Sequence, residues 1–268
     1  AKIWSEFVPL CQLEQGRVVS VKGKVGEYQG SPEITIESSQ IVEEDISLYQ
    51  SKIRALVFDI ETVGQDFTKL SDWEKDYLLE HLERNNSNKS DAKNKTGLYA
   101  LFGFVCSIAS YDTLTGKGTL FHLCKEKLIN PTGYELKTFS SEEDLLQAFW
   151  TLCDVYQTFV TFNGFEFDIP FLALRSASKR VRVPSKMVSL DRNQHIDLAQ
   201  RFKQGSRGFK LEALTRFLGL SNPKEKGVSG LHVANLYRAG QHQDIVDYVA
   251  RDVQSTNQLY ELYLRYLS

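Results

Sequence analysis

Residues 56–64, LVFDIETVG, decide the fold, because an apolar strand-like run carries two acidic side chains separated by one residue. Side chains on a β-strand alternate between the two faces of the sheet, so positions two apart point the same way. Asp59 and Glu61 are therefore predicted to lie side by side. Two unpaired carboxylates at that distance raise at least one pKa, which costs stability unless a cation or a proton intervenes. We expect a positively charged ligand here; a solvated pair facing a loop is the alternative.

The composition is that of an ordinary soluble globular protein. Hydrophobic residues make up 42% and charged residues 25% of the 268-residue chain, and the formal net charge is -2. The length suits one large domain or two small ones, at roughly 100 to 200 residues per domain. Because the charge is nearly balanced, a nucleic-acid partner would have to be held by local basic patches.

Neither a membrane anchor nor a secretion signal is expected. No apolar run approaches the roughly 20 residues needed to cross a bilayer, and residues 1–10, AKIWSEFVPL, lack the basic region and apolar core of a signal peptide. We therefore expect a cytoplasmic protein without a membrane partner. The four cysteines form no C-x-x-C pair and the five histidines no H-E-x-x-H, so zinc is not expected.

The first 50 residues are predicted to form a separate β segment. Residues 17–42 alternate apolar and polar side chains, and the turn residues EYQGSP at 27–32 predict a hairpin. This segment is similar to the last strands of an OB-fold, but it is too short for a full barrel and would be a fragment of one. We place a domain boundary near residue 50, which leaves residues 51–268 as the main domain.

The main domain is predicted to be α/β, with helices on the faces of a mixed sheet, because strand-like segments come first and helices alternate with strands later. Ser140 and Glu143 form a capping-box pattern before one helix. The polar residues 84–96 predict a surface loop with little role in the core. Strands are expected at 54–60, 102–111, 118–124 and 157–164, and helices at 73–83, 142–156, 210–220, 230–240 and 243–267.

Further acidic residues are candidates for the same site. Asp168 lies in an apolar aromatic context, where a carboxylate needs a cation or a donor, although it could instead cap a helix that Pro170 begins. Tyr248 and Asp252 are four residues apart on a predicted helix, so they share one face. Each also has an ordinary interpretation, a core tyrosine and an exposed helix acid. Asp197 is interpreted as a structural residue.

Three motifs together resemble the DEDD superfamily of 3′-to-5′ exonucleases, in the branch whose last motif carries tyrosine. They are FDIET, FNGFEFD with Asn163 and Asp168, and YVARD with Tyr248 and Asp252, in the expected order and spacing. The resemblance spans about residues 52–262 and implies a ribonuclease H-like fold. Within the superfamily, the chain looks most like predicted exonucleases related to the proofreading domain of family B DNA polymerases.

The four carboxylates form an all-oxygen site that suits Mg2+ or Mn2+ better than zinc. Two such ions can activate a water and stabilise the leaving oxygen of a phosphodiester. The resemblance implies that Asp59 bridges both ions, that Glu61 and Asp252 complete one, and that Asp168 holds the other. It also implies that Tyr248 orients the attacking water. The implied reaction releases nucleoside monophosphates from the 3′ end of single-stranded nucleic acid, with DNA favoured over RNA.

Substrate contacts are expected from Thr62 and Asn163 near the terminal nucleotide and from Phe165 or Phe167 as a stacking surface, although Phe167 is favoured as a core residue. Two basic runs could contact phosphates or could form a solvated face. Their basic residues are Lys179, Arg180, Arg182, Arg201, Lys203, Arg207 and Lys210.

Two other functions remain open. One is a nucleic-acid-binding protein that uses an inactive nuclease scaffold and the OB-like strands; the other is a ribonuclease H-like endonuclease. The complete set of acids favours catalysis over a scaffold. The Y-x-x-x-D helix favours chemistry at a strand end.

Overall fold

The computed structural model describes residues 19–28, 31–41, 54–84, 92–188, 194–221 and 230–267. The chain divides into two compact units, Ala1–Ile53 together with Leu264–Ser268, and Arg54–Tyr263. The domain boundary near residue 50 stays a prediction. Within the described part of the chain, no helix combines the length and the apolar character that a membrane span requires.

The N-terminal unit contains a β-hairpin. Strands β1 (Val19–Tyr28) and β2 (Ser31–Ile41) pair in an antiparallel register that runs from Val19 opposite Ile41 to Tyr28 opposite Ser31. The register shifts between Lys22 and Gly23. The predicted hairpin is confirmed, while residues 29 and 30 of its turn lie outside the described residues. The likeness to an OB-fold stays a prediction.

The main unit is built on a mixed six-stranded sheet with the order β6-β5-β4-β3-β7-β8. Strand β4 runs antiparallel to both β3 and β5, whereas β5 with β6, β3 with β7 and β7 with β8 are parallel pairs. This α/β architecture confirms the predicted ribonuclease H-like fold class. The strands are β3 (Ala55–Gly64), β4 (Gly103–Asp112), β5 (Lys117–Leu123), β6 (Tyr134–Phe139), β7 (Thr158–Thr161) and β8 (His195–Asp197).

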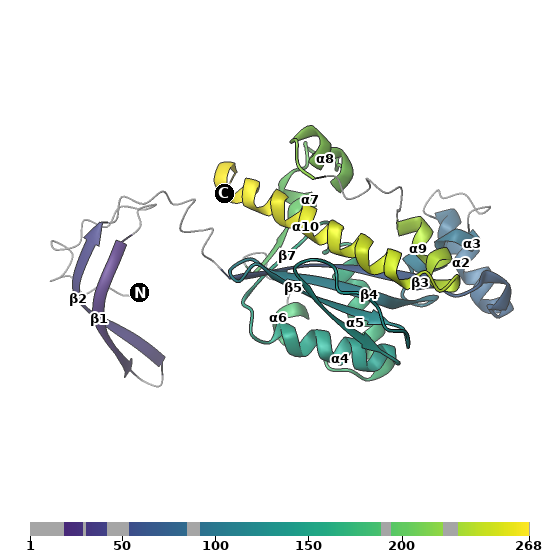
Figure 1. Cartoon of the computed structure of the whole chain (residues 1–268), viewed down its shortest axis with the longest axis horizontal. Helices are drawn as coiled ribbons and strands as arrows, with labels where there is room; N and C mark the ends of the chain where they lie inside the picture. Colours follow the sequence, from purple (N-terminus) through teal and green to yellow (C-terminus); the bar gives the residue numbers. More distant parts are fainter. Residues whose placement is uncertain are drawn as a thin grey trace. The chain divides into compact units, whose positions relative to one another are not determined.

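Helices cover both faces of the sheet. In Figure 1 the long yellow helix α10 crosses one face, and α4 and α5 lie against the other. The helices are η1 (Phe67–Lys69), α2 (Asp72–Arg84), α3 (Ala92–Lys95), η3 (Thr96–Leu98), α4 (Glu142–Cys153), α5 (Asp168–Lys179), α6 (Ser185–Val188), α7 (Leu198–Arg201), α8 (Leu211–Phe217), α9 (Gly230–Arg238) and α10 (His242–Tyr266).

The side chains of β3 alternate between the two faces of the sheet, and each face is covered by helices. Phe58 and Ile60 are buried in the main core together with Leu145 and Phe149 of α4. The rings of Phe58 and Phe149 lie 5.3 Å apart between centroids. Because side chains alternate along a strand, the intervening residue Asp59 faces the α10 layer. The alternation predicted from the sequence therefore directs the acids to the side of the sheet that α10 covers.

The polar segment 84–96 is only partly described, and the prediction that it has little role in the core is wrong for its end. Ala92 begins α3 and is 2% exposed, packed with Leu78, Leu82 and Phe102. Thr96 is buried as well. Residues 85–91 lie outside the described residues.

The start of α4 differs by one residue from the expected capping box. Ser141, not Ser140, is the N-cap, and its hydroxyl accepts a hydrogen bond from the amide of Asp144. Glu142 in the first turn is buried and forms a bidentate pair with Arg175 of α5, at 2.9 and 2.6 Å. Glu142 also accepts from the amide of Val105 in β4. This carboxylate therefore joins two helices to the sheet.

Candidate active site

Three acidic side chains from two distant parts of the chain converge at the α10 face of the sheet. Carboxylate oxygens of Asp59, Glu61 and Asp252 all lie within 4.8 Å of one another. Asp59 and Glu61 come from β3, and the pairing with β4 shifts register directly after Glu61. Asp252 comes from the middle of α10. The structure thus brings together the two motifs that lie farthest apart in the sequence.

The three-acid cluster places like negative charges close together. Burial raises the pKa of Asp59 well above its usual range, and the nearby carboxylates of Asp168, Asp252 and Glu61 raise it further, although part of the Asp59 side chain is exposed. Burial and the charges of Asp252 and Asp168 likewise raise the pKa of Glu61. A bound divalent cation would remove this repulsion. The all-oxygen donor set fits a hard ion such as Mg2+ or Mn2+.

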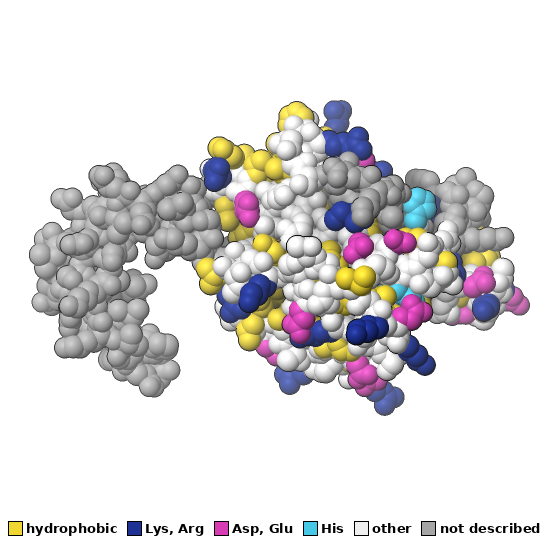
Figure 2. Space-filling view, in the orientation of Figure 1, with side chains coloured by type: hydrophobic (Ala, Val, Ile, Leu, Met, Phe, Trp, Pro, Cys, Tyr) yellow, Lys and Arg dark blue, Asp and Glu magenta, His cyan; other side chains and the backbone are white. Residues whose placement is uncertain are grey.

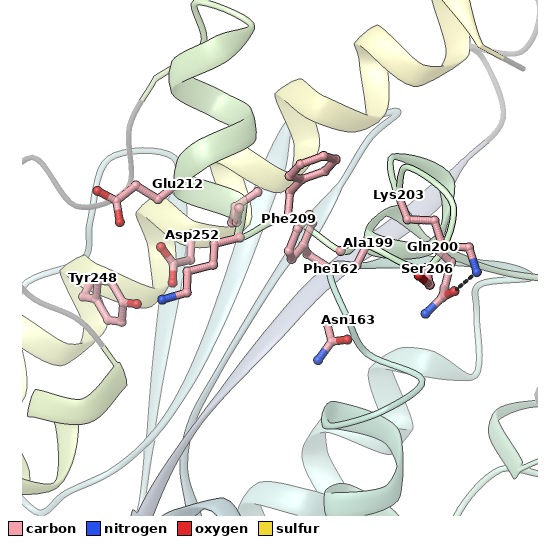
Figure 3. A pocket seen from close by; sticks show the side chains of 13 residues that line it. Phe162, Asn163, Ala199, Gln200, Lys203, Ser206, Phe209, Glu212, Tyr248 and Asp252 are labelled. Atoms are coloured by element: carbon pink, nitrogen blue, oxygen red, sulfur yellow. Dashed lines mark hydrogen bonds between the residues drawn. The ribbon is translucent and has the colours of Figure 1, made fainter.

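Tyr248 lies one helical turn before Asp252, and both line a pocket beside the cluster (Figure 3). Its side chain is buried, packed with Val63, Cys106 and Ile245. Burial, the carboxylates of Glu61 and Asp252 and a hydrogen bond to Asp252 all raise the pKa of Tyr248. The phenol therefore stays protonated at neutral pH and acts as a hydrogen-bond donor.

Asp168 lies apart from the three-acid cluster, at the first position of α5. Strand β7 pairs with β3 only as far as Val57, so the amide of Ile60 has no strand partner on that side. The Asp168 carboxylate accepts that N–H at 3.1 Å. Burial raises the pKa of Asp168 to about 7, although this hydrogen bond opposes the shift. The side chain bonds β3 instead of capping its own helix, and its charge still reaches Asp59 and Glu61.

A tight turn between β7 and α5 sets the position of Asp168. Asn163 adopts the left-handed backbone conformation with φ 67°, which asparagine tolerates better than most residues. A side chain on Gly164 would collide with Thr161, so only glycine fits there. The buried carboxylate of Asp197 accepts hydrogen bonds from the amides of Asn163 and Phe165, at 2.8 and 3.1 Å. Asp197 therefore has the structural role expected of it.

The other predicted contact residues occupy different surroundings. Thr62 donates its hydroxyl hydrogen bond to the carbonyl of Gly97 at 2.6 Å. Phe165 is half-buried, with its ring 4.6 Å from the ring of His195. Phe167 packs against the main core, as its sequence context favoured. Asn163 is exposed and lines the pocket that also contains Asp252.

This pocket has a volume of about 560 Å³ and extends away from the acids. Figure 3 shows Tyr248 and Asp252 at one end and Lys203 and Gln200 at the other, with Phe162 and Phe209 between them. Neither phenylalanine was predicted from the sequence. Phe209 had a usable signal, because an aromatic side chain inside a polar basic run is typical of nucleic-acid-binding surfaces.

A family model described as a predicted 3′-5′ exonuclease related to the exonuclease domain of PolB matches residues 132–268. No curated protein gives a match. The matched region contains Asp168, Tyr248 and Asp252, whereas Asp59 and Glu61 precede it. The fold places these two acids beside Asp252, which lies in the matched region.

Proposed function

Because the chain belongs to this family of predicted 3′-5′ exonucleases, we propose that it hydrolyses nucleic acid from the 3′ end in a reaction that depends on divalent cations. The observation that carries the proposal is the convergence of Asp59, Glu61 and Asp252 within 4.8 Å of one another beside an open pocket. We take the substrate to be single-stranded, with DNA favoured over RNA, and the products to be nucleoside monophosphates.

Asp59, Glu61 and Asp252 are the proposed ligands of Mg2+ or Mn2+, with Asp168 as the fourth acid. When bound, two such cations supply the Lewis acidity that activates water and stabilises the leaving oxygen of a phosphodiester. The proposed role of Asp168 combines support of β3 at Ile60 with a contribution to the negative charge at the site.

Tyr248 is proposed to orient the attacking water through its hydroxyl group. Its raised pKa excludes a role as general base near neutral pH, because the phenolate is not populated there. The hydrogen bond to Asp252 fixes the phenol beside the acids. Asn163 is the proposed contact to the terminal nucleotide, since it lines the pocket beside Asp252, and Thr62 and Phe165 are the remaining candidates.

The first experiment follows the shortening of 5′-labelled single-stranded DNA, duplex DNA and RNA, with Mg2+ or Mn2+ and with excess chelator. We expect stepwise shortening only with a divalent cation, and loss of that shortening in both Asp59→Asn and Asp252→Asn. The matched control is Asp244→Asn, which removes an exposed acid from the first turn of the same helix.

Folding of the inactive variants is checked by thermal melting. Because burial and secondly like charges raise the pKa of Asp59, Asp59→Asn should melt no lower than the parent without divalent cations. The parent should gain stability when Mn2+ is added, and the variant should gain less. Hydrolysis in excess chelator, or undiminished hydrolysis in both acid variants, would overturn the proposal.

A further inference from the structure

The loop between α7 and α8 contains a tight turn that two backbone hydrogen bonds close. The amide of Gln204 bonds the carbonyl of Arg207 at 3.0 Å, and the amide of Arg207 bonds the carbonyl of Gln204 at 3.1 Å. Gly205 adopts a left-handed conformation with φ 62°, which glycine permits at no steric cost. These bonds form a tight turn whose flanking residues, Lys203 and Lys210, both line the pocket.

The side chains that this loop adds to the pocket suit a strand of nucleic acid. Lys203 and Lys210 are exposed cations, and Phe209 is 41% exposed. The Lys203 ammonium donates to the amide oxygen of Gln200 at 2.9 Å, which orients the charge without neutralising it (Figure 3). Lysine contacts phosphates, and an exposed aromatic ring stacks on an unpaired base.

The other basic run has a different role in the fold. Lys186 donates to the carbonyl oxygens of Asp154 and Tyr156, and Lys179 lies 3.9 Å from Glu142. Arg180 ends α5 in a left-handed conformation. Figure 2 shows Lys and Arg side chains interspersed with Asp and Glu, so no single positive field covers the visible face. The basic residues that line the pocket are therefore a local feature.

We propose that the loop Lys203–Lys210 is a clamp for the single strand on the 5′ side of the scissile phosphodiester. The proposal rests on the function given above, which places that phosphodiester at the three-acid cluster. A nucleotide at a 3′ end carries the scissile phosphate and a free 3′-hydroxyl, so it offers no second phosphate to a lysine. Lys203, which Figure 3 shows at the end of the pocket away from Tyr248 and Asp252, therefore requires the strand that continues in the 5′ direction.

The size of the pocket agrees with this assignment. Its volume of about 560 Å³ lies within the range of roughly 300 to 1,000 Å³ that is usual for small-molecule sites. Phe162 on one wall and Phe209 on the loop provide apolar surface for bases, and neither requires a particular base. The clamp should consequently favour single strands over duplexes without reading their sequence.

Binding is tested in the 268-residue chain that carries Asp59→Asn, so that the strand remains intact. The affinity for a fluorescent eight-nucleotide oligothymidylate is measured against salt concentration, with and without Lys203→Gln and Lys210→Gln together. Because each phosphate contact to a single strand contributes about 0.7 to the slope of log K against log salt, the double variant should lower that slope by about 1.4. Phe209→Ala should weaken binding by about 5- to 150-fold.

The matched control removes two lysines near the opposite edge of the sheet. Lys117 and Lys137 lie on β5 and on the edge strand β6, whereas the pocket lies at the β7 and β8 side. Lys117→Gln with Lys137→Gln should keep the parental slope. If the loop variant also keeps the parental slope, or if both pairs lower it equally, the clamp is overturned.

Hydrolysis separates the clamp from the proposed function. In the active protein, the loop variant should raise KM for the eight-nucleotide strand by at least tenfold. Lys203→Gln alone should leave kcat/KM for a dinucleoside monophosphate unchanged, because that substrate has no second phosphate. If the protein binds the strand with the predicted slopes but cleaves neither substrate, the proposed function fails and the clamp stands. If it cleaves both and the loop variant behaves like the parent, the clamp fails and the function stands.

Discussion

At the scale of single residues, the candidate site is a set of like charges that the fold holds close together. Asp59 and Glu61 have raised pKa values mainly because they are buried and secondly because other acids surround them. Such an arrangement lowers the stability of the protein without a ligand, and perturbed groups of this kind gather at functional sites. Tyr248 contributes a hydrogen bond to this set and carries no charge of its own.

Tyr248→Phe should slow hydrolysis and leave the fold intact. The ring continues to pack against Val63 and Ile245, and no carboxylate is removed. Loss of a hydrogen bond that positions water should lower kcat by about 10- to 1000-fold, at roughly 1.4 kcal/mol of barrier per tenfold. Single-turnover hydrolysis and a thermal melt measure the two effects.

Tyr260→Phe is the matched control, because Tyr260 is also a buried tyrosine of α10 but is not part of the cluster. It should leave kcat unchanged. A Tyr248→Phe protein that cleaves at the parental rate would contradict the assigned role of Tyr248, even if the acids still form a nuclease site.

At the scale of elements, strand β3 is held in place at the end that follows the acids. A Cβ on Gly64 would lie 2.3 Å from the amide nitrogen of Gly97 and 2.0 Å from the hydroxyl oxygen of Thr96. Arg238 of α9 donates to the carbonyl of Gly64 at 2.7 Å. The strand therefore packs directly on η3, and these contacts fix the direction in which β3 leaves the site.

Gly64→Ala should destabilise the protein by about 1 to 3 kcal/mol, because the new methyl group meets backbone atoms that cannot rotate away. Displacement of η3 should also disturb the hydrogen bond of Thr62 and lower hydrolysis. For stability alone, the control is Gly208→Ala, since no atom lies within 4 Å of the position of its Cβ. Equal midpoints of urea unfolding for the two variants would show that η3 does not constrain the end of β3.

The sequence analysis predicted the elements in which apolar residues recur with a clear period. It missed the elements that lack such a period. β6 lies at the edge of the sheet and exposes half of its side chains, so its apolar alternation is weak. β8 spans only His195–Asp197, which is too short to show a period. Ala92 looked like part of a polar loop because the apolar residues it packs against, Leu78, Leu82 and Phe102, lie outside that loop in the sequence.

At the scale of the whole main unit, α10 is joined to the sheet by a buried pair of histidines. The Nε2 atom of His122 in β5 lies 3.0 Å from Nδ1 of His242 at the start of α10. The ring of Tyr237 packs against both, with centroid distances of 6.3 and 4.8 Å. Burial, and secondly the neighbouring His242, lower the pKa of His122 to about 3.

Stability should therefore fall as the pH falls below about 6.5. An unfolded histidine takes up a proton near pH 6.5, whereas folded His122 does so only near pH 3, so the unfolded state binds more protons between these values. The stabilisation is fully present above pH 6.5 and declines by about 1 kcal/mol for each pH unit below it. Urea unfolding at pH 7, 6 and 5 should show this decline relative to His122→Phe, which cannot take up the proton.

Asp168, whose pKa is raised to about 7, affects stability in the opposite direction, but it is present in both proteins and cancels in the comparison. His232→Gln, which changes an exposed histidine outside this pair, is the matched control. A difference between parent and His122→Phe that stays constant from pH 7 to pH 5 would contradict the prediction.

Strand periodicity predicted that Asp59 lies beside Glu61, and helix periodicity predicted that Tyr248 and Asp252 share one face. The meeting of these two motifs in one site was implied by the resemblance to the DEDD exonucleases. The sequence could not predict that Asp168 would bond the amide of Ile60, because that contact depends on where β7 ends. It also could not predict the pocket beside Asp252, because Phe162 and Phe209 come from separate loops that the folded chain brings together.

The hydrogen bond between Asp168 and Ile60 has an evolutionary consequence. An asparagine at position 168 would present a carbonyl oxygen in the same place, so the amide of Ile60 would keep its acceptor while the negative charge disappeared. A single substitution could therefore remove an acid from the site and preserve the support of β3. This substitution would separate the proposed hydrolysis from the proposed binding of a strand.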